Sequence, residues 1–79
     1  MSIGQRAKLV REKAGLSIPE VSRAMIRDSS DAPTEDWLRL LEAGHIGSPG
    51  GKPLLLLARA LGVDLTWLLE GDRTGGDAA

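Results

Sequence analysis

The sequence has 79 residues, with ten Lys and Arg against eleven Asp and Glu, and therefore a formal net charge of −1. A chain this short forms one domain with a small core, so its stability is expected to gain from a partner or a second copy. The absence of cysteine excludes disulfides, thiolate zinc sites and a thiol nucleophile. The near-neutral charge argues against nucleic-acid binding through bulk positive charge.

No segment is predicted to enter a membrane. The longest purely apolar run, residues 54–58, is much too short for a span. The N-terminal residues lack the apolar stretch of a signal peptide. We therefore expect a cytoplasmic protein without a membrane partner. A single histidine and no cysteine also predict no metal and no cofactor.

Capping and turn residues predict two helices in the first third of the chain. Ser2 can cap a first helix that runs to about Ala14. Gly15 follows it, at the position where a helix commonly ends with a glycine in the left-handed conformation. Ser17 and Glu20 have the spacing of a capping box, which predicts that a second helix begins there. Pro19 is tolerated because first-turn amides have no intrahelical partner, and it does not count against this helix.

The capping and turn residues in the rest of the chain predict three more helices. Residues 28–33 consist of turn-forming types and predict a loop. After it, Thr34 can cap a third helix that ends at Gly44. Pro53 suits the first position of a fourth helix. Gly62 is expected to end the fourth helix. Asp64 can cap a fifth helix, which is predicted over residues 65–69.

No alternating strand pattern occurs, so the sequence predicts an all-α domain of five short helices. The domain is expected over residues 1–72, followed by a flexible C-terminal tail, residues 73–79, because that tail consists of Gly, Asp, Ala and other small or polar residues. No internal repeat or second domain is indicated.

Three motifs resemble the phage-repressor and Cro-type helix-turn-helix family, also called XRE-like regulators. They are Arg-Glu-Lys-Ala-Gly-Leu-Ser at residues 11–17, Leu-x-x-Leu-Glu-x-Gly at residues 38–44, and the run from residue 57 to residue 71 that joins a helix, its glycine and the next helix. The resemblance covers nearly the whole chain and implies a lambda-repressor-like DNA-binding domain.

The resemblance also implies where such a domain touches DNA, with the third helix in the major groove. The base-proximal residues would be Thr34, Glu35, Asp36 and Arg39. The phosphate contacts would be Arg23, Arg27, His45, Ser48 and Lys52. An ion pair between Arg11 and Glu42 would link the first helix to the end of the third.

Two departures from the family pattern leave alternatives open. About six extra residues lengthen the turn between the second and third helices, over residues 26–33. They are either a tolerated surface insertion, or they change the angle of the third helix or add a contact element. Glu35 and Asp36 either accept hydrogen bonds from cytosine N4 or only stabilise the helix dipole. Ile18 replaces a glutamine often found there, so one phosphate contact is expected to be missing.

Some apolar side chains exceed what so small a core can bury. Trp37 and Leu40 lie on a helix face that the family leaves polar, and Leu55 and Leu56 are surplus to the expected core of the fourth helix. We predict that at least one of these two patches forms an interface for self-association. The alternative is that the long loops cover them.

These features predict a sequence-specific DNA-binding transcriptional regulator, a repressor that acts as a homodimer. The charges support a phosphate-facing surface, since residues 1–27 carry a balance of +4 and residues 28–79 a balance of −5. The alternative is an interaction module of the same fold that binds another regulator, a sigma factor or a toxin. No catalytic constellation suggests an enzyme.

Overall fold

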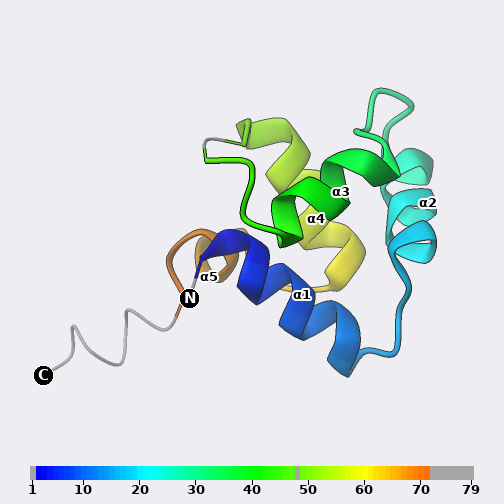
Figure 1. The fold of residues 1–79 in the computed structure, drawn as a ribbon. Helices are drawn as coiled ribbons and strands as arrows, with labels where there is room; N and C mark the ends of the chain where they lie inside the picture. Colours follow the sequence, from blue (N-terminus) through cyan, green and yellow to red (C-terminus); the bar gives the residue numbers. More distant parts are fainter. Residues whose placement is uncertain (1, 48, 72–79) are drawn as a thin grey trace, which may run out of the picture.

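A computed structural model describes residues 2–47 and 49–71, and this part of the chain contains five α-helices and no strand (Figure 1). The all-α class predicted from the sequence is confirmed. The predicted tail, residues 73–79, lies outside the described residues. The helices are α1 (Ile3–Lys13), α2 (Ile18–Asp28), α3 (Glu35–Glu42), α4 (Gly51–Leu61) and α5 (Leu65–Glu70).

Two helices begin with reciprocal capping hydrogen bonds. The Glu20 amide donates to the Ser17 hydroxyl over 3.2 Å, and the Ser17 amide donates to the Glu20 carboxylate over 2.8 Å. Ser2 and Gln5 form the same arrangement at the start of α1, over 3.2 and 2.9 Å. Both pairs satisfy amides that have no partner within the helix.

Other predicted helix starts differ in detail. Thr34 and Asp64 occupy the N-cap positions of α3 and α5, but neither side chain makes a capping hydrogen bond. Helix α4 begins at Gly51 and not at Pro53. Proline is accommodated there because the third helical residue still lies in the first turn, where its missing N–H removes no intrahelical hydrogen bond.

The predicted glycine stops are present. Gly15 and Gly62 have φ angles of +71° and +72° at the ends of α1 and α4. A side chain is disfavoured in this left-handed conformation, which lets the chain reverse and return the Val63 amide to the Ala58 carbonyl at 3.0 Å.

The core forms where α4 packs against α2 and α5, and α1 packs against α3 and α5. Leu56 is only 4% exposed, so its predicted place at an interface is wrong. Because α4 contacts helices on more than one side, it buries a wider face than a single apolar stripe. The buried apolar residues are Ala7, Val21, Met25, Leu38, Leu41, Leu54, Leu56, Leu57, Ala58, Leu61 and Leu68.

The connection between α2 and α3 is shorter than the predicted loop over residues 26–33. Helix α2 continues to Asp28, which leaves residues 29–34 outside the helices. Ala32 packs against the core from this loop. Residues 26–28, predicted to lie in the turn, therefore belong to α2.

Two ion pairs join this region to α4. Arg59 Nη1 lies 3.4 Å from Asp28 Oδ2, and Lys52 Nζ lies 3.8 Å from Asp31 Oδ2. Exposed pairs of this kind contribute little to stability. They do place the end of α2 and the connection that follows it beside α4.

Arg6 is a buried cation that links the two ends of the fold. Its side chain, on α1, donates from Nε to the Leu68 carbonyl at 2.8 Å and from Nη2 to the Leu69 carbonyl at 2.7 Å. The last carbonyls of a helix lack intrahelical donors and carry the negative end of its dipole. Arg6 therefore satisfies the end of α5 and holds it against α1.

Candidate nucleic-acid interface

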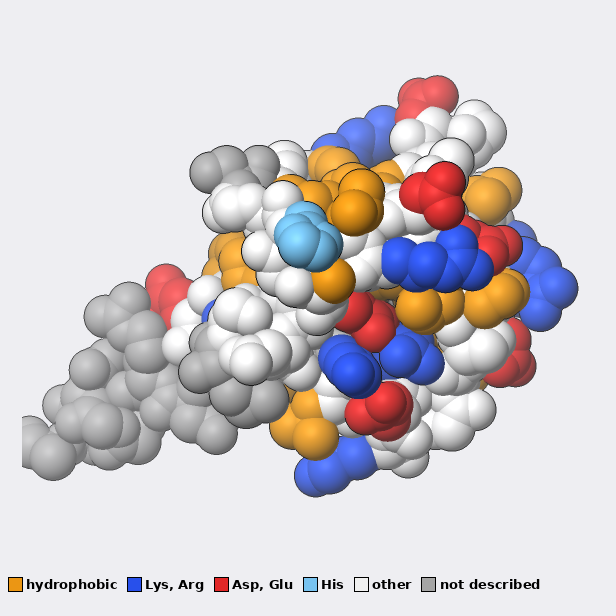
Figure 2. All heavy atoms as spheres, in the orientation of Figure 1, with side chains coloured by type: hydrophobic (Ala, Val, Ile, Leu, Met, Phe, Trp, Pro, Cys, Tyr) orange, Lys and Arg blue, Asp and Glu red, His pale blue; other side chains and the backbone are white. Residues whose placement is uncertain are grey.

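Helix α3 has one face in the core and the other in solvent. Leu38 and Leu41 are each 1% exposed, whereas Asp36, Arg39 and Leu40 are exposed. The two buried leucines fix the rotation of the helix. Basic and acidic side chains are interspersed over the face that carries α3, and no single basic field covers it (Figure 2).

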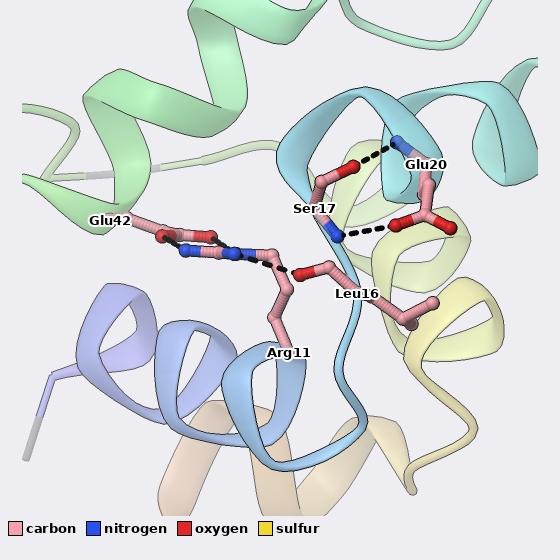
Figure 3. Close-up of polar contacts among 5 residues, drawn as sticks. All are labelled: Arg11, Leu16, Ser17, Glu20 and Glu42. Carbon is pink, nitrogen blue, oxygen red and sulfur yellow. Dashed lines mark hydrogen bonds and ion pairs between the residues drawn. The ribbon is translucent and has the colours of Figure 1, made fainter.

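The ion pair expected between Arg11 and Glu42 is present and holds the C-terminal end of α3 on α1 (Figure 3). Arg11 Nε and Nη2 donate to the two carboxylate oxygens of Glu42 at 2.8 and 2.9 Å, and Nη1 donates to the Leu16 carbonyl at 2.9 Å. The hydrogen bond to Glu42 raises the pKa of the Arg11 guanidinium. The side chains are 13% and 7% exposed, so the pair is largely removed from solvent.

Gly4 permits a close approach of α1 to the same end of α3. A Cβ atom on Gly4 would overlap the carbonyl oxygen of Leu41, and would lie 2.8 Å from its carbonyl carbon and 3.2 Å from Cα of Glu42. Gly4 was not among the residues predicted to have a role. Its signal was a glycine inside a helical pattern, which can mark close backbone packing.

The base-proximal residues expected from the resemblance lie together on α3, with Glu35 and Asp36 in its first turn and Arg39 in its last. Arg39 Nη2 is 3.1 Å from Glu35 Oε1, and Arg39 Nη1 is 3.2 Å from Asp36 Oδ1. The side chains of Glu35, Asp36 and Arg39 are 42%, 86% and 53% exposed. Thr34 precedes them and is also exposed. We call Glu35, Asp36 and Arg39 the α3 cluster; its formal charge is −1.

Two of the expected phosphate-binding residues are exposed cations on α2. Arg23 and Arg27 make no ion pair with the residues that the structure describes. They border an open groove of about 340 Å³ between α2 and α4. The groove is lined by Leu16, Glu20, Val21, Arg23, Ala24, Arg27 and Ala60.

The other expected phosphate contacts are placed differently. His45 is exposed just after α3. Lys52 is exposed but lies near the carboxylate of Asp31, so a phosphate would have to compete with that group. Ser48 lies outside the described residues.

The expected apolar interface divides into exposed and covered residues. Leu40 and Leu55 are 47% and 37% exposed, in agreement with their expected surface positions. Trp37 is half-buried and packs against the core, while Leu56 belongs to the core. Leu40 and Leu55 are therefore the members of this set that can contact a second molecule through an exposed apolar surface.

Acid is expected to weaken the start of α2. The Ser17 amide and then the Ser17 side chain lower the pKa of Glu20 below its ordinary value of 4.5, and Arg23 lowers it further. A carboxyl group with a lowered folded-state pKa stabilises the fold above its unfolded-state pKa, and this contribution is lost as the pH falls through the folded-state value. Urea unfolding at a series of pH values should show the free energy of unfolding decreasing below about pH 4.5.

Glu20→Gln provides the control, because glutamine keeps an acceptor for the Ser17 amide but does not titrate. Its unfolding free energy should depend less on pH in this acid range than that of the parent chain. Equal pH dependence of the two proteins would contradict the role assigned to Glu20.

Within residues 2–47 and 49–71, no helix has the length and apolar character needed to cross a membrane. The same residues contain no group of three or more His, Cys, Asp or Glu side chains arranged to hold a metal ion. No family model matches the sequence, and no characterised protein or solved structure is significantly similar to it.

Proposed function

We propose that the protein is a sequence-specific DNA-binding regulator, a repressor that acts as a homodimer with α3 in the major groove of each half-site. The observation that carries this proposal is the arrangement of α3. Its polar start is exposed, while Leu38, Leu41 and the Arg11–Glu42 pair hold its other face and its end. A rigid helix with an exposed polar face is the element that reads base edges in helix-turn-helix proteins.

Arg23 and Arg27 supply the phosphate contacts in this proposal. They lie one turn apart on α2, are exposed, and make no ion pair within 4.0 Å in the part of the chain that the structure describes, although Arg23 still lowers the pKa of Glu20. A cation without a close ion pair can bind phosphate without first breaking a direct salt bridge. Because the net charge is only −1, affinity depends on these local contacts and not on a general positive field.

Dimer formation would use the exposed apolar residues. Leu55 on α4 and Leu40 on α3 place apolar area in solvent, and a small core gains stability when a second subunit covers such area. A two-fold dimer would bind two half-sites about one helical turn apart, which predicts a palindromic operator.

The test is selection of bound sequences from random DNA, followed by fluorescence anisotropy at several salt concentrations. The selected sequence should be palindromic and should bind two chains. Arg23→Ala and Arg27→Ala should each weaken binding about equally for all sequences and reduce the salt slope by about 1. Arg59→Ala removes an exposed arginine that already has a carboxylate partner, so it should change the slope less.

Absence of saturable, salt-sensitive binding would reject the DNA-binding proposal. It would favour a second candidate function, a module that binds another regulator. The observation in favour of this candidate is Leu40, which is 47% exposed on the same helix as the carboxylates of Glu35 and Asp36. An apolar residue among acidic ones suits a protein surface better than a polyanion.

A further inference from the structure

The α3 cluster presents an unusual set of charges for a surface that faces DNA. Two carboxylates would repel phosphates, but the Arg39 guanidinium spans both, at 3.1 Å from Glu35 and 3.2 Å from Asp36. The cluster therefore approaches DNA with one excess negative charge instead of two. Its exposed groups also combine hydrogen-bond donors on Arg39 with acceptors on Asp36, side by side.

This pattern is complementary to one base pair. Across the major groove a G·C pair presents two acceptors on guanine, N7 and O6, followed by a donor on cytosine, N4. A guanidinium beside a carboxylate presents donors followed by an acceptor. An A·T pair presents acceptor, donor and acceptor in that order, so it offers no adjacent pair of acceptors to a guanidinium.

We propose that the α3 cluster selects G·C pairs, with Arg39 donating to guanine O6 and N7, and Asp36 accepting from cytosine N4. This inference rests on the proposed DNA-binding function and specifies the sequence that it reads. Asp36 is assigned to cytosine because its side chain is 86% exposed, against 42% for Glu35. Glu35, four residues before Arg39, is the positioning residue that keeps the guanidinium at the start of the helix.

Arg39 can leave the Asp36 carboxylate for guanine at little cost in free energy, because exposed ion pairs contribute little to stability. When Arg39 turns from Asp36 to guanine, the released carboxylate would face a polyanion without a partner. The cytosine amino group supplies that partner in the same base pair. At an A·T pair the adenine N6 donor stands between the two acceptors, N7 and thymine O4. Arg39 then cannot donate to two adjacent acceptors, and Asp36 has no cytosine amino group to accept from.

The experiment uses the full chain and its selected operator. Each base pair is replaced in turn, and dissociation constants are measured for the parent chain, Arg39→Ala, Asp36→Asn and Glu35→Gln. At one position in each half-site, replacing G·C by A·T should weaken the parent roughly tenfold. Arg39→Ala should lose this preference, and Glu35→Gln should reduce it while leaving the salt slope unchanged.

A modified base tests the contact with guanine directly. 7-Deazaguanine lacks the N7 acceptor, so at the same position it should weaken the parent chain several-fold and leave Arg39→Ala unaffected. Arg59→Ala is the matched control, since it also removes an exposed arginine paired with an aspartate; it should respond to 7-deazaguanine as the parent does. Melting temperatures close to that of the parent would verify that every variant is folded.

The possible outcomes distinguish failure of the G·C assignment from failure of the proposed DNA-binding function. Saturable, salt-sensitive binding to an operator whose base preferences are the same for the parent and Arg39→Ala would overturn the G·C assignment and leave DNA binding in place. Half-sites that contain only A·T pairs would overturn it as well. If no DNA binds, both the assignment and the function fail.

Discussion

Replacing Gly4 by alanine should lower the free energy of unfolding by about 3 kcal/mol, which is the upper part of the range for overpacking in a core. The same substitution in an unobstructed helix stabilises by about 0.5–1 kcal/mol. The sign is reversed because the new Cβ would overlap the backbone carbonyl of Leu41, and a backbone atom cannot move aside as the end of a side chain can. Urea denaturation measures the change.

Gly51→Ala is the matched control, because nothing lies within 4 Å of a Cβ atom at that helical glycine. It should leave the free energy of unfolding unchanged or raise it slightly. If Gly4→Ala were as stable as Gly51→Ala, α1 would not pack on the end of α3 as described.

Removing Glu42 should also destabilise the protein by about 3 kcal/mol. In Glu42→Ala the largely buried Arg11 guanidinium would keep its hydrogen bond to the Leu16 carbonyl but lose its countercharge. A buried charge without a partner is costly, which is why the deletion of one member exceeds the net contribution of the pair. Thermal or urea unfolding with circular dichroism measures the loss.

The double variant Arg11→Met with Glu42→Leu distinguishes an uncompensated charge from a loss of packing. It removes both charges while keeping much of the volume, so it should be clearly more stable than Glu42→Ala. Asp36→Ala provides a second comparison, since it breaks an exposed pair and should cost less than 1 kcal/mol. Equal losses in Glu42→Ala and the double variant would show that charge burial is not the cause.

Local chemistry made the helices predictable. Ser17, Glu20 and Gly15 act through residues within a few positions of themselves, and each acts as its sequence context indicates. The Arg11–Glu42 pair spans 31 residues, and here the resemblance supplied what spacing alone does not. The start of α4 was misplaced because proline is tolerated throughout the first turn, so it does not mark a single position.

Interactions that depend on how the helices pack were not predictable from local patterns. Leu56 is buried because α4 has neighbours on more than one side, a property of the assembled fold. The roles of Gly4 and Arg6 depend on residues 41 and 68, which are distant in sequence. In the candidate interface, the positions at the start of α3 could be named, but the Arg39 bridge between Glu35 and Asp36 required side-chain geometry.

The hydrogen bonds of Arg6 have a consequence for synthesis on the ribosome. They join α1 to carbonyls 62 and 63 residues later in the chain, so these two contacts can form only after the last helix has been made. A nascent chain that ends before α5 leaves Arg6 without these acceptors. The docking of α1 on α5 is therefore expected to be a late event in the folding of this domain, which follows the synthesis of Leu69.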